Sequence, residues 1–199
     1  MSDPIEEAAT AALSGGLIVI PTDTVHGIGT RPDDPAATAK LFAAKGRPRN
    51  LVLPVLVASR ADAERVAVLD DRARALAGRF WPGPLSIVVP RTPWSAGWAL
   101  GDDSATIAVR MPHHPLALAV LARTGPLAVT SANRSGEPTP ATGAELQAVF
   151  GEAVDVYLCA EDPLEGRPST VIDLTGPEFR VLRLGAIGED DLRQALTHA

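Results

Sequence analysis

The sequence predicts an α/β fold in which helices flank a twisted, mostly mixed β-sheet. Short apolar runs that suit buried strands alternate with longer segments of helical spacing along most of the chain. Near the end, two apolar runs at 170–174 and 179–184 are separated by the turn sequence TGP, which is typical of a hairpin. Because a hairpin joins antiparallel strands and the earlier alternation favours parallel ones, we expect both kinds of pairing in one sheet.

The composition is that of an ordinary globular protein. With 199 residues, of which 46% are hydrophobic, the chain is long enough for one core, and we expect a single domain over 1–199. A net charge of −6 argues against a protein that coats nucleic acids in general. Cys159 is the only cysteine, so an intrachain disulfide cannot form. The first residues lack the basic and apolar regions of a signal peptide, so we expect a cytoplasmic protein without membrane contact.

Capping and breaking residues place the first elements. Asp3 can cap a helix over 3–14, which a pair of glycines ends. The apolar run 17–20 then predicts a buried strand, because it is short, continuous and stopped by a proline. Asp34 can cap a second helix over 35–45, which a single glycine closes.

The later elements follow from the same signals. A WPGP turn separates a helical segment from a strand, and a loop with two tryptophans follows that strand at 90–103. The expected elements are strand 52–57, helices 59–68 and 71–80, strands 85–89 and 106–110, helix 115–123, strand 127–130, helix 143–150, strand 154–159, the two late strands, and a helix over 190–198.

Polar clusters follow several predicted strands, where open α/β sheets bind their ligands. The segment PTDTVHGIG at 21–29 could hold a small polar ligand with its hydroxyls, although a polar turn with glycines would read the same way. The segment KGRPRN at 45–50 places three cations within five residues. They could grip a triphosphate, or they could complement a helix C-terminus as a solvated turn.

Arg110 stands at the end of a predicted strand and shares one face of it with Thr106 and Ala108. A buried guanidinium needs an anionic partner, which could be a substrate carboxylate or an internal Asp or Glu. The loop TSANRSG at 130–136 offers uncharged donors that suit a nucleobase, a ribose or a phosphate. Arg183 and the PST segment at 168–170 could complete the site.

Several common catalytic motifs are missing. The sequence contains no GxxxxGK[ST] loop, no third glycine of a dinucleotide fingerprint and no GxSxG elbow. It therefore does not predict a P-loop hydrolase or an activated serine.

Taken in order, the clusters resemble the YrdC-like family, the threonylcarbamoyl-AMP synthases. The matching segments are PTDTVHGIG (21–29), KGRP (45–48), WPGPLSIVV (81–89), TIAVRMP (106–112), TSANRSGEPTPAT (130–142), STVID (169–173) and VLRLGAI (181–187). The resemblance implies the short single-domain form, with the YrdC-like sheet and its helices arranged around a deep groove.

The resemblance also implies a reaction. The family joins ATP, L-threonine and bicarbonate into threonylcarbamoyl-AMP and pyrophosphate, a nucleotidyl transfer that serves N6-threonylcarbamoyladenosine (t6A) modification of tRNA. Mg²⁺ would arrive on ATP rather than in a metal site of the protein. The product would pass to a tRNA threonylcarbamoyl transferase complex. The alternative function is an RNA-binding module of the same fold, and weak RNA binding could also accompany the enzyme.

Roles for individual residues come from the same resemblance. The residues implied to bind threonine are Thr24, Arg110, Thr130 and Ser169, with Arg110 on the carboxylate. The residues implied to bind ATP are Lys45, Arg47, Thr106, Ala132, Asn133, Pro140 and Arg183, of which Lys45 and Arg47 would act in catalysis on the phosphates.

The chain departs from the family pattern at three positions. His26 stands where tyrosine is usual, Val52 where a proline is frequent, and Leu56 where some members have a histidine. The threonine pocket is therefore expected to differ in detail.

Overall fold

A nine-stranded mixed sheet forms the centre of the molecule. The computed structural model describes residues 3–164 and 166–197. The strands are β1 Ile18–Ile20, β2 Gly27–Thr30, β3 Val55–Leu56, β4 Leu85–Pro90, β5 Thr106–Arg110, β6 Leu127–Ser131, β7 Val156–Tyr157, β8 Thr170–Asp173 and β9 Arg180–Arg183. Their order in the sheet is β7-β1-β2-β6-β3-β5-β4-β8-β9. The pairs β1/β7, β3/β5 and β4/β8 are parallel and the others antiparallel, which confirms the mixed sheet.

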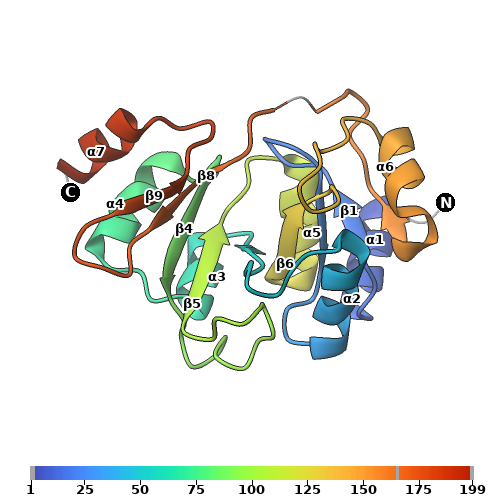
Figure 1. The fold of residues 1–199 in the computed structure, drawn as a ribbon, viewed down its shortest axis with the longest axis horizontal. Coiled ribbons are helices and arrows are strands. Elements are labelled where there is room, and N and C mark those ends of the chain that lie inside the picture. Colours follow the sequence, from blue (N-terminus) through green and yellow to red (C-terminus); the bar gives the residue numbers. More distant parts are fainter. Residues whose placement is uncertain (1–2, 165, 198–199) are drawn as a thin grey trace.

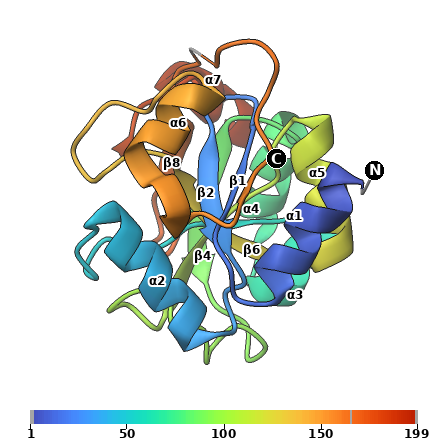
Figure 2. The same ribbon diagram turned by 90° about the vertical axis from the view of Figure 1, so that its right-hand side faces the viewer.

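Helices surround both halves of this sheet (Figures 1 and 2). They are α1 Pro4–Leu13, α2 Pro35–Lys45, α3 Arg60–Val66, α4 Asp71–Phe80, α5 Pro115–Thr124, α6 Gly143–Phe150 and α7 Glu189–Thr197, with a 3-10 turn at Gly151–Ala153. In Figure 1, α1, α2, α5 and α6 gather around β1, β2 and β6, whereas α4 and α7 lie beside β4, β8 and β9. Within the described residues, no helix is long and apolar enough to cross a membrane.

Side-chain caps set the helix starts, as the sequence predicts. Asp3 accepts a hydrogen bond from the backbone of α1, and Asp34 accepts one at 2.8 Å from that of α2. Thr142 and Glu145 form a reciprocal capping box at the start of α6. Gly46 ends α2 at a φ of 58°, a left-handed conformation that glycine adopts without a steric penalty.

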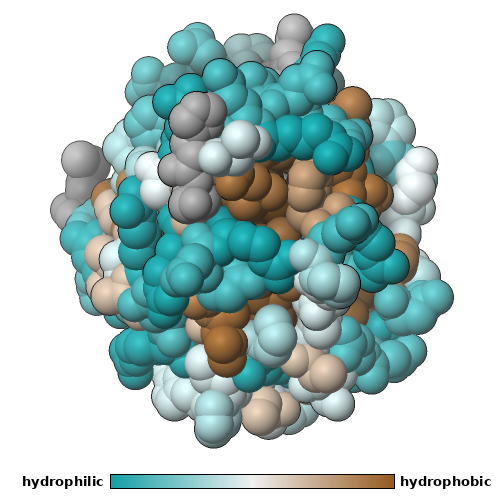
Figure 3. Space-filling view, turned by 90° about the vertical axis from the view of Figure 1, so that its left-hand side faces the viewer, coloured by the Kyte–Doolittle hydropathy of each residue, from teal (hydrophilic) through white to brown (hydrophobic). Residues whose placement is uncertain are grey.

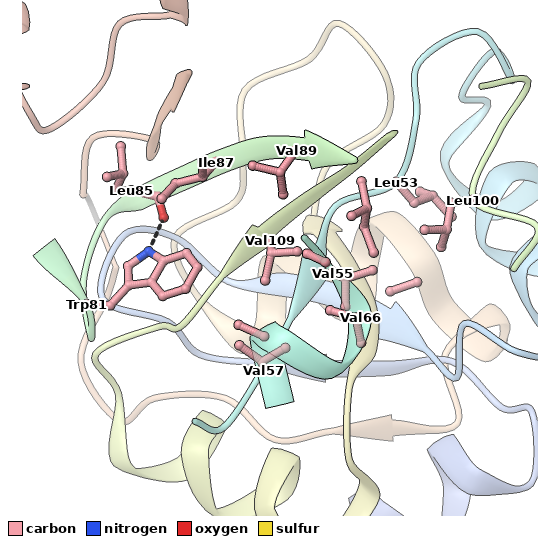
Figure 4. Packing of buried hydrophobic residues seen from close by; sticks show 14 of the residues in the cluster. Leu53, Val55, Val57, Val66, Trp81, Leu85, Ile87, Val89, Leu100 and Val109 are labelled. Atoms are coloured by element: carbon pink, nitrogen blue, oxygen red, sulfur yellow. Dashed lines mark hydrogen bonds between the residues drawn. The ribbon is translucent and has the colours of Figure 1, made fainter. Parts of the chain in front are cut away.

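The alternation of side chains along the strands divides the core into two clusters. Ile18 and Ile20 pack in a smaller cluster with alanines of α1 and apolar residues of α5. Val19, between them, points into the larger cluster on the other face, so β1 is buried on both sides. The larger cluster surrounds Trp81, whose indole N–H donates to the Leu85 carbonyl at 2.7 Å (Figure 4).

The two faces of strands β4 and β5 differ: one packs in the core, and the other lines a cavity. Ile87 and Val109 point into the larger cluster and are fully buried (Figure 4). Because side chains alternate, their neighbours Ser86 and Ala108 lie on the opposite face. These side chains line a cavity instead of packing against a core.

Strand β2 is the main element that the sequence did not predict. Residues 21–29 resembled a polar turn, yet Gly27–Thr30 is a buried strand between β1 and β6. The glycines mislead because they usually weaken strands. A Cβ at Gly29 would lie 2.6 Å from the Ala128 carbonyl oxygen, so this close approach to β6 requires glycine.

Other differences concern boundaries. The predicted strands 52–57 and 154–159 shrink to two residues each, Val55–Leu56 and Val156–Tyr157. The predicted helix 190–198 is α7, and its last predicted position lies outside the described residues. The late hairpin of β8 and β9 is confirmed.

Truncating the core should weaken the fold far more than truncating the surface. We expect Ile87→Ala to lower the free energy of unfolding by about 2–5 kcal/mol, since the side chain is fully buried and leaves a cavity. Val68→Ala, at a side chain that is half exposed, should change it by less than about 0.5 kcal/mol. Urea unfolding of both variants provides the measurement. Equal losses would contradict the assignment of Ile87 to the core.

Candidate active site

A cavity of about 820 Å³ draws its walls from strands on both halves of the sheet. Eight of the predicted site residues line it: Thr24, Arg47, Thr106, Arg110, Thr130, Asn133, Ser169 and Arg183. Leu182 of edge strand β9 also contributes, although more than half of this residue is exposed. Viewed from the side that carries β9 and α7, hydrophobic side chains gather in hollows framed by hydrophilic ones (Figure 3).

Arg110, at the buried end of β5, is held by three acceptors. Its Nε donates to the Gly83 carbonyl at 3.0 Å, Nη1 to the Thr24 hydroxyl at 3.1 Å, and Nη2 to Asp23 Oδ1 at 2.7 Å. The sequence left open whether its anionic partner was internal, and the structure supplies Asp23. Burial lowers the pKa of Arg110, and the Asp23 carboxylate partly opposes this effect.

The turn after β1 presents hydroxyls beside that guanidinium. Thr22 Oγ1 donates to the Val25 carbonyl at 2.6 Å, and the Thr24 N–H donates back to Thr22 Oγ1 at 3.2 Å. These local bonds rigidify the turn, as threonine hydroxyls commonly do. Thr24 is thereby placed with its hydroxyl against Arg110 and along the cavity.

A second hydroxyl cluster lies at the start of β8. The hydroxyls of Ser169 and Ser86 are 3.1 Å apart, and Arg183 Nη2 donates to Ser169 Oγ at 3.0 Å. Arg183 also donates twice to the Ser169 carbonyl, at 3.1 and 2.9 Å. Arg183 of β9 is therefore hydrogen-bonded to Ser169, which the family resemblance implies to bind threonine.

Three guanidiniums share the cavity. Arg47, on the loop after α2, donates from Nε to the Leu51 carbonyl at 2.8 Å. Burial is the main cause that lowers the pKa of Arg47, and the positive charge of Arg183 lowers it further. The charge of Arg183 also lowers the pKa of Arg110. Within the described part of the chain, no carboxylate lies within ion-pair distance of Arg47 or Arg183, whereas Arg110 has Asp23. Three carboxylates, of Asp103, Glu137 and Asp173, line the cavity as well, so its formal charges balance. The guanidiniums of Arg47 and Arg183 are therefore a local site for anions such as phosphates.

Lys45 takes a different place from the one expected. Its ammonium donates at 2.6 Å to the Ser131 carbonyl and also to the Asn133 carbonyl and side-chain oxygen. It is 2% exposed and does not line the cavity. Burial is the main cause that lowers its pKa to about 8, and Arg47 adds to the effect. In this structure Lys45 clamps the 131–133 loop from behind, and its contact with phosphate stays a prediction.

Two other residues of the predicted ATP site also lie away from the cavity wall. Ala132 is fully buried, and its N–H donates to the His26 carbonyl at 2.8 Å. Pro140 is half-buried and precedes α6. The resemblance located their loop, which reaches the cavity through Ser131 and Asn133.

The three departures from the family pattern all line the cavity: His26, Val52 and Leu56. His26 Nε2 accepts from the Ala160 N–H at 3.3 Å, so the proton of the neutral ring must sit on Nδ1. Burial, followed by the nearby His114, lowers the pKa of His26. A neutral imidazole therefore stands beside the turn that carries Thr24.

Sequence reasoning missed Asp23 and Ser86, both of which contact predicted site residues. The need of a buried Arg110 for an anionic partner could have pointed to Asp23, since it is the acidic residue of the 21–29 cluster. Nothing local marks Ser86 out, because its role follows from the parallel pairing of β4 with β8. Among the described residues, no group of three or more His, Cys, Asp or Glu side chains could hold a metal ion.

The buried ammonium of Lys45 predicts a pH-dependent stability. Its folded pKa of about 8 lies below the ordinary value of 10.5, so the unfolded chain binds more protons between these values. We expect wild type to gain stability relative to Lys45→Met as the pH rises from 8 to 10, because the cost of burying the charge disappears. Urea unfolding of both proteins at several pH values measures this. A constant difference between them would contradict it.

The chain is similar to known proteins over most of its length. Residues 10–185 match the model of the Sua5/YciO/YrdC family, which is described as "Telomere recombination". The chain is 43% identical over 193 residues to a provisionally named threonylcarbamoyl-AMP synthase of Mycobacterium tuberculosis, covering 96% of this chain and 88% of that one. It is 39% identical over 182 residues to the threonylcarbamoyl-AMP synthase of Chromohalobacter salexigens, covering 89% and 96%.

A solved structure agrees with the fold. The crystal structure of Pyrococcus abyssi Sua5 complexed with L-threonine superposes with a TM-score of 0.88 at 32% identity. It covers 98% of this chain, which spans 58% of the archaeal one. On the family model and on these relatives, the chain belongs to the Sua5/YciO/YrdC family.

Proposed function

We propose that this protein is a threonylcarbamoyl-AMP synthase that joins ATP, L-threonine and bicarbonate and releases pyrophosphate. The observation that carries the proposal is the cavity in which Arg47, Arg110 and Arg183 meet buried hydroxyls. Relatives named for this activity, and a related structure that contains L-threonine, support it. The net charge of −6 favours this enzyme over an RNA-binding module of the same fold.

The threonine would lie at the Arg110 end of the cavity. Arg110 has donors left for a carboxylate, because a guanidinium carries five N–H groups and three of them are engaged. Thr24, Thr130 and Ser169 are buried hydroxyls that line the same cavity and can bind the polar groups of an amino acid.

The triphosphate would lie along Arg47 and Arg183, with Thr106 and Asn133 toward the nucleoside. Mg²⁺ would enter as part of the substrate MgATP, held mainly by phosphate oxygens and water. The guanidiniums would neutralise charge that builds up on the departing pyrophosphate.

The reaction needs no covalent enzyme intermediate. The neutral threonine amine adds to the carbon of carbon dioxide and releases a proton, or adds to that of bicarbonate with loss of water, and either route gives a carbamate. An oxygen of that carbamate attacks the α-phosphorus, and the bond to the β-phosphate oxygen breaks as pyrophosphate leaves. The protein contributes orientation and guanidiniums that face the phosphates, which are effective when reactants are held in line. We place the reaction in the cytoplasm, with the product passed to a tRNA threonylcarbamoyl transferase complex for t6A synthesis.

Pyrophosphate release tests the proposal directly. With purified protein and MgATP, we expect release only when L-threonine and bicarbonate are both present, since both are needed to form the carbamate that attacks the α-phosphorus. A coupled pyrophosphate assay with either substrate omitted is the measurement. Release that ignores threonine would point to another acceptor, and absence of release with all substrates would overturn the proposal.

The phosphate role of Arg47 predicts a selective defect. We expect Arg47→Ala to raise KM for MgATP by about 10–100-fold, because a charge-assisted contact to phosphate is lost, with a smaller effect on KM for threonine. Arg79→Ala is the matched control, since Arg79 is exposed on α4 and outside the cavity wall. Steady-state kinetics of both variants decide the matter. An unchanged KM for MgATP in Arg47→Ala would refute the assignment.

A further inference from the structure

In the ion pair between Asp23 and Arg110, one carboxylate oxygen of Asp23 accepts hydrogen bonds and the other accepts none among the described residues. Its side chains are only 13% and 7% exposed. Both bonds to the carboxylate end on Oδ1, from Arg110 Nη2 at 2.7 Å and from the His113 N–H at 2.8 Å. The other oxygen, Oδ2, is buried and has no hydrogen-bond partner among the described residues.

Hydrogen bonding alone does not explain a carboxylate at position 23. An amide oxygen of asparagine could accept both bonds that Oδ1 accepts. The second carboxylate oxygen adds a buried charge without a donor, which is costly. What Asp23 provides beyond an amide is its negative charge, and the cation closest to it is Arg110.

The geometry places this charge behind the ligand-facing surface. Arg110 lines the cavity, whereas Asp23 does not. Thr24 and the Gly83 carbonyl hold the other nitrogens, so the guanidinium has a fixed orientation and two N–H groups to spare. Two other charged or titratable groups interact electrostatically with the pair. Arg183 repels Arg110, and His114 interacts with the carboxylate of Asp23.

We propose that Asp23 is a positioning residue that makes the Arg110 subsite select a zwitterionic amino acid over a simple carboxylate. With Asp23 behind it, Arg110 can bind a carboxylate while the pair as a whole stays neutral. A ligand that also carries an ammonium is then favoured, and one with only a negative charge is not, because the two charges of the pair act on the ligand with opposite signs. The inference rests on the proposed function and names a determinant of its amino-acid specificity.

A pair of ligands separates this role from simple support of the fold. The ligands are L-threonine and 3-hydroxybutanoate, which has the same skeleton without the amino group. In Asp23→Asn the hydrogen bonds can persist while the charge is lost. We expect Kd for 3-hydroxybutanoate to fall about tenfold and Kd for threonine to change much less, because the lost attraction for the ammonium offsets the lost repulsion of the carboxylate, as measured by titration calorimetry. In turnover, kcat with threonine should stay within about threefold, since Asp23 does not contact the reacting atoms, while 3-hydroxybutanoate should become a stronger competitive inhibitor.

Controls guard against a general effect of lost charge. Asp33→Asn breaks the ion pair with Arg31, in which both partners are well exposed, and should leave both Kd values unchanged. Asp23→Glu keeps the charge and should keep the preference for threonine. If Asp23→Asn does not fold by circular dichroism, Asp23→Ser removes the same charge with a smaller side chain and is measured in its place.

The outcomes distinguish this inference from the proposed function. Weakening of both ligands in the uncharged variant, or no change in either, overturns the role of Asp23 while wild-type threonine binding still supports the enzyme. Failure of wild type to bind threonine, even with MgATP and bicarbonate present, overturns the proposed function and this inference with it.

Discussion

The guanidinium of Arg110, at the buried end of β5, needs hydrogen-bond acceptors and a negative charge beside it, and much of the site provides them. An unpaired charge at such a position would be very costly, so Arg110 draws three acceptors from two separate segments. They are the carbonyl of Gly83 before β4, the Thr24 hydroxyl and the Asp23 carboxylate. One side chain therefore ties the turn after β1 to strands on the other half of the sheet and leaves two donors for a ligand.

The cavity exists because one sheet face lacks a helical cover. The larger core holds the Ile87 and Val109 side of β4 and β5, and alternation turns Ser86 and Ala108 toward the opposite side. That side combines apolar side chains with hydroxyls and charged groups, whose polar atoms need water or a ligand. Arg47 and Arg183, which have no carboxylate at ion-pair distance among the described residues, offer anion-binding groups in a protein whose net charge is −6, so anion binding is a local property and not one of the composition.

Lys45 shows how a motif residue can serve a site without lining it. Its ammonium gathers the carbonyls of Ser131 and Asn133, and the cost of burial is visible in its lowered pKa. The 131–133 loop is thereby fixed relative to α2, and its polar side chains reach the cavity. A reaction that depends on orientation and phosphate charge benefits from such a rigid frame.

The sequence by itself determined the local structure: the helix caps, the mixed sheet, the late hairpin, and the shared strand face of Thr106, Ala108 and Arg110. These depend on neighbours within a few residues, whose preferences are readable from the chain. The resemblance to a known family located most of the cavity wall. Tertiary structure alone decided that Gly27–Thr30 is a strand, that Asp23 is the partner of Arg110, and that Lys45 faces a loop. Each of these is a contact across more than eighty residues, or a close approach of two strands, which no local preference encodes.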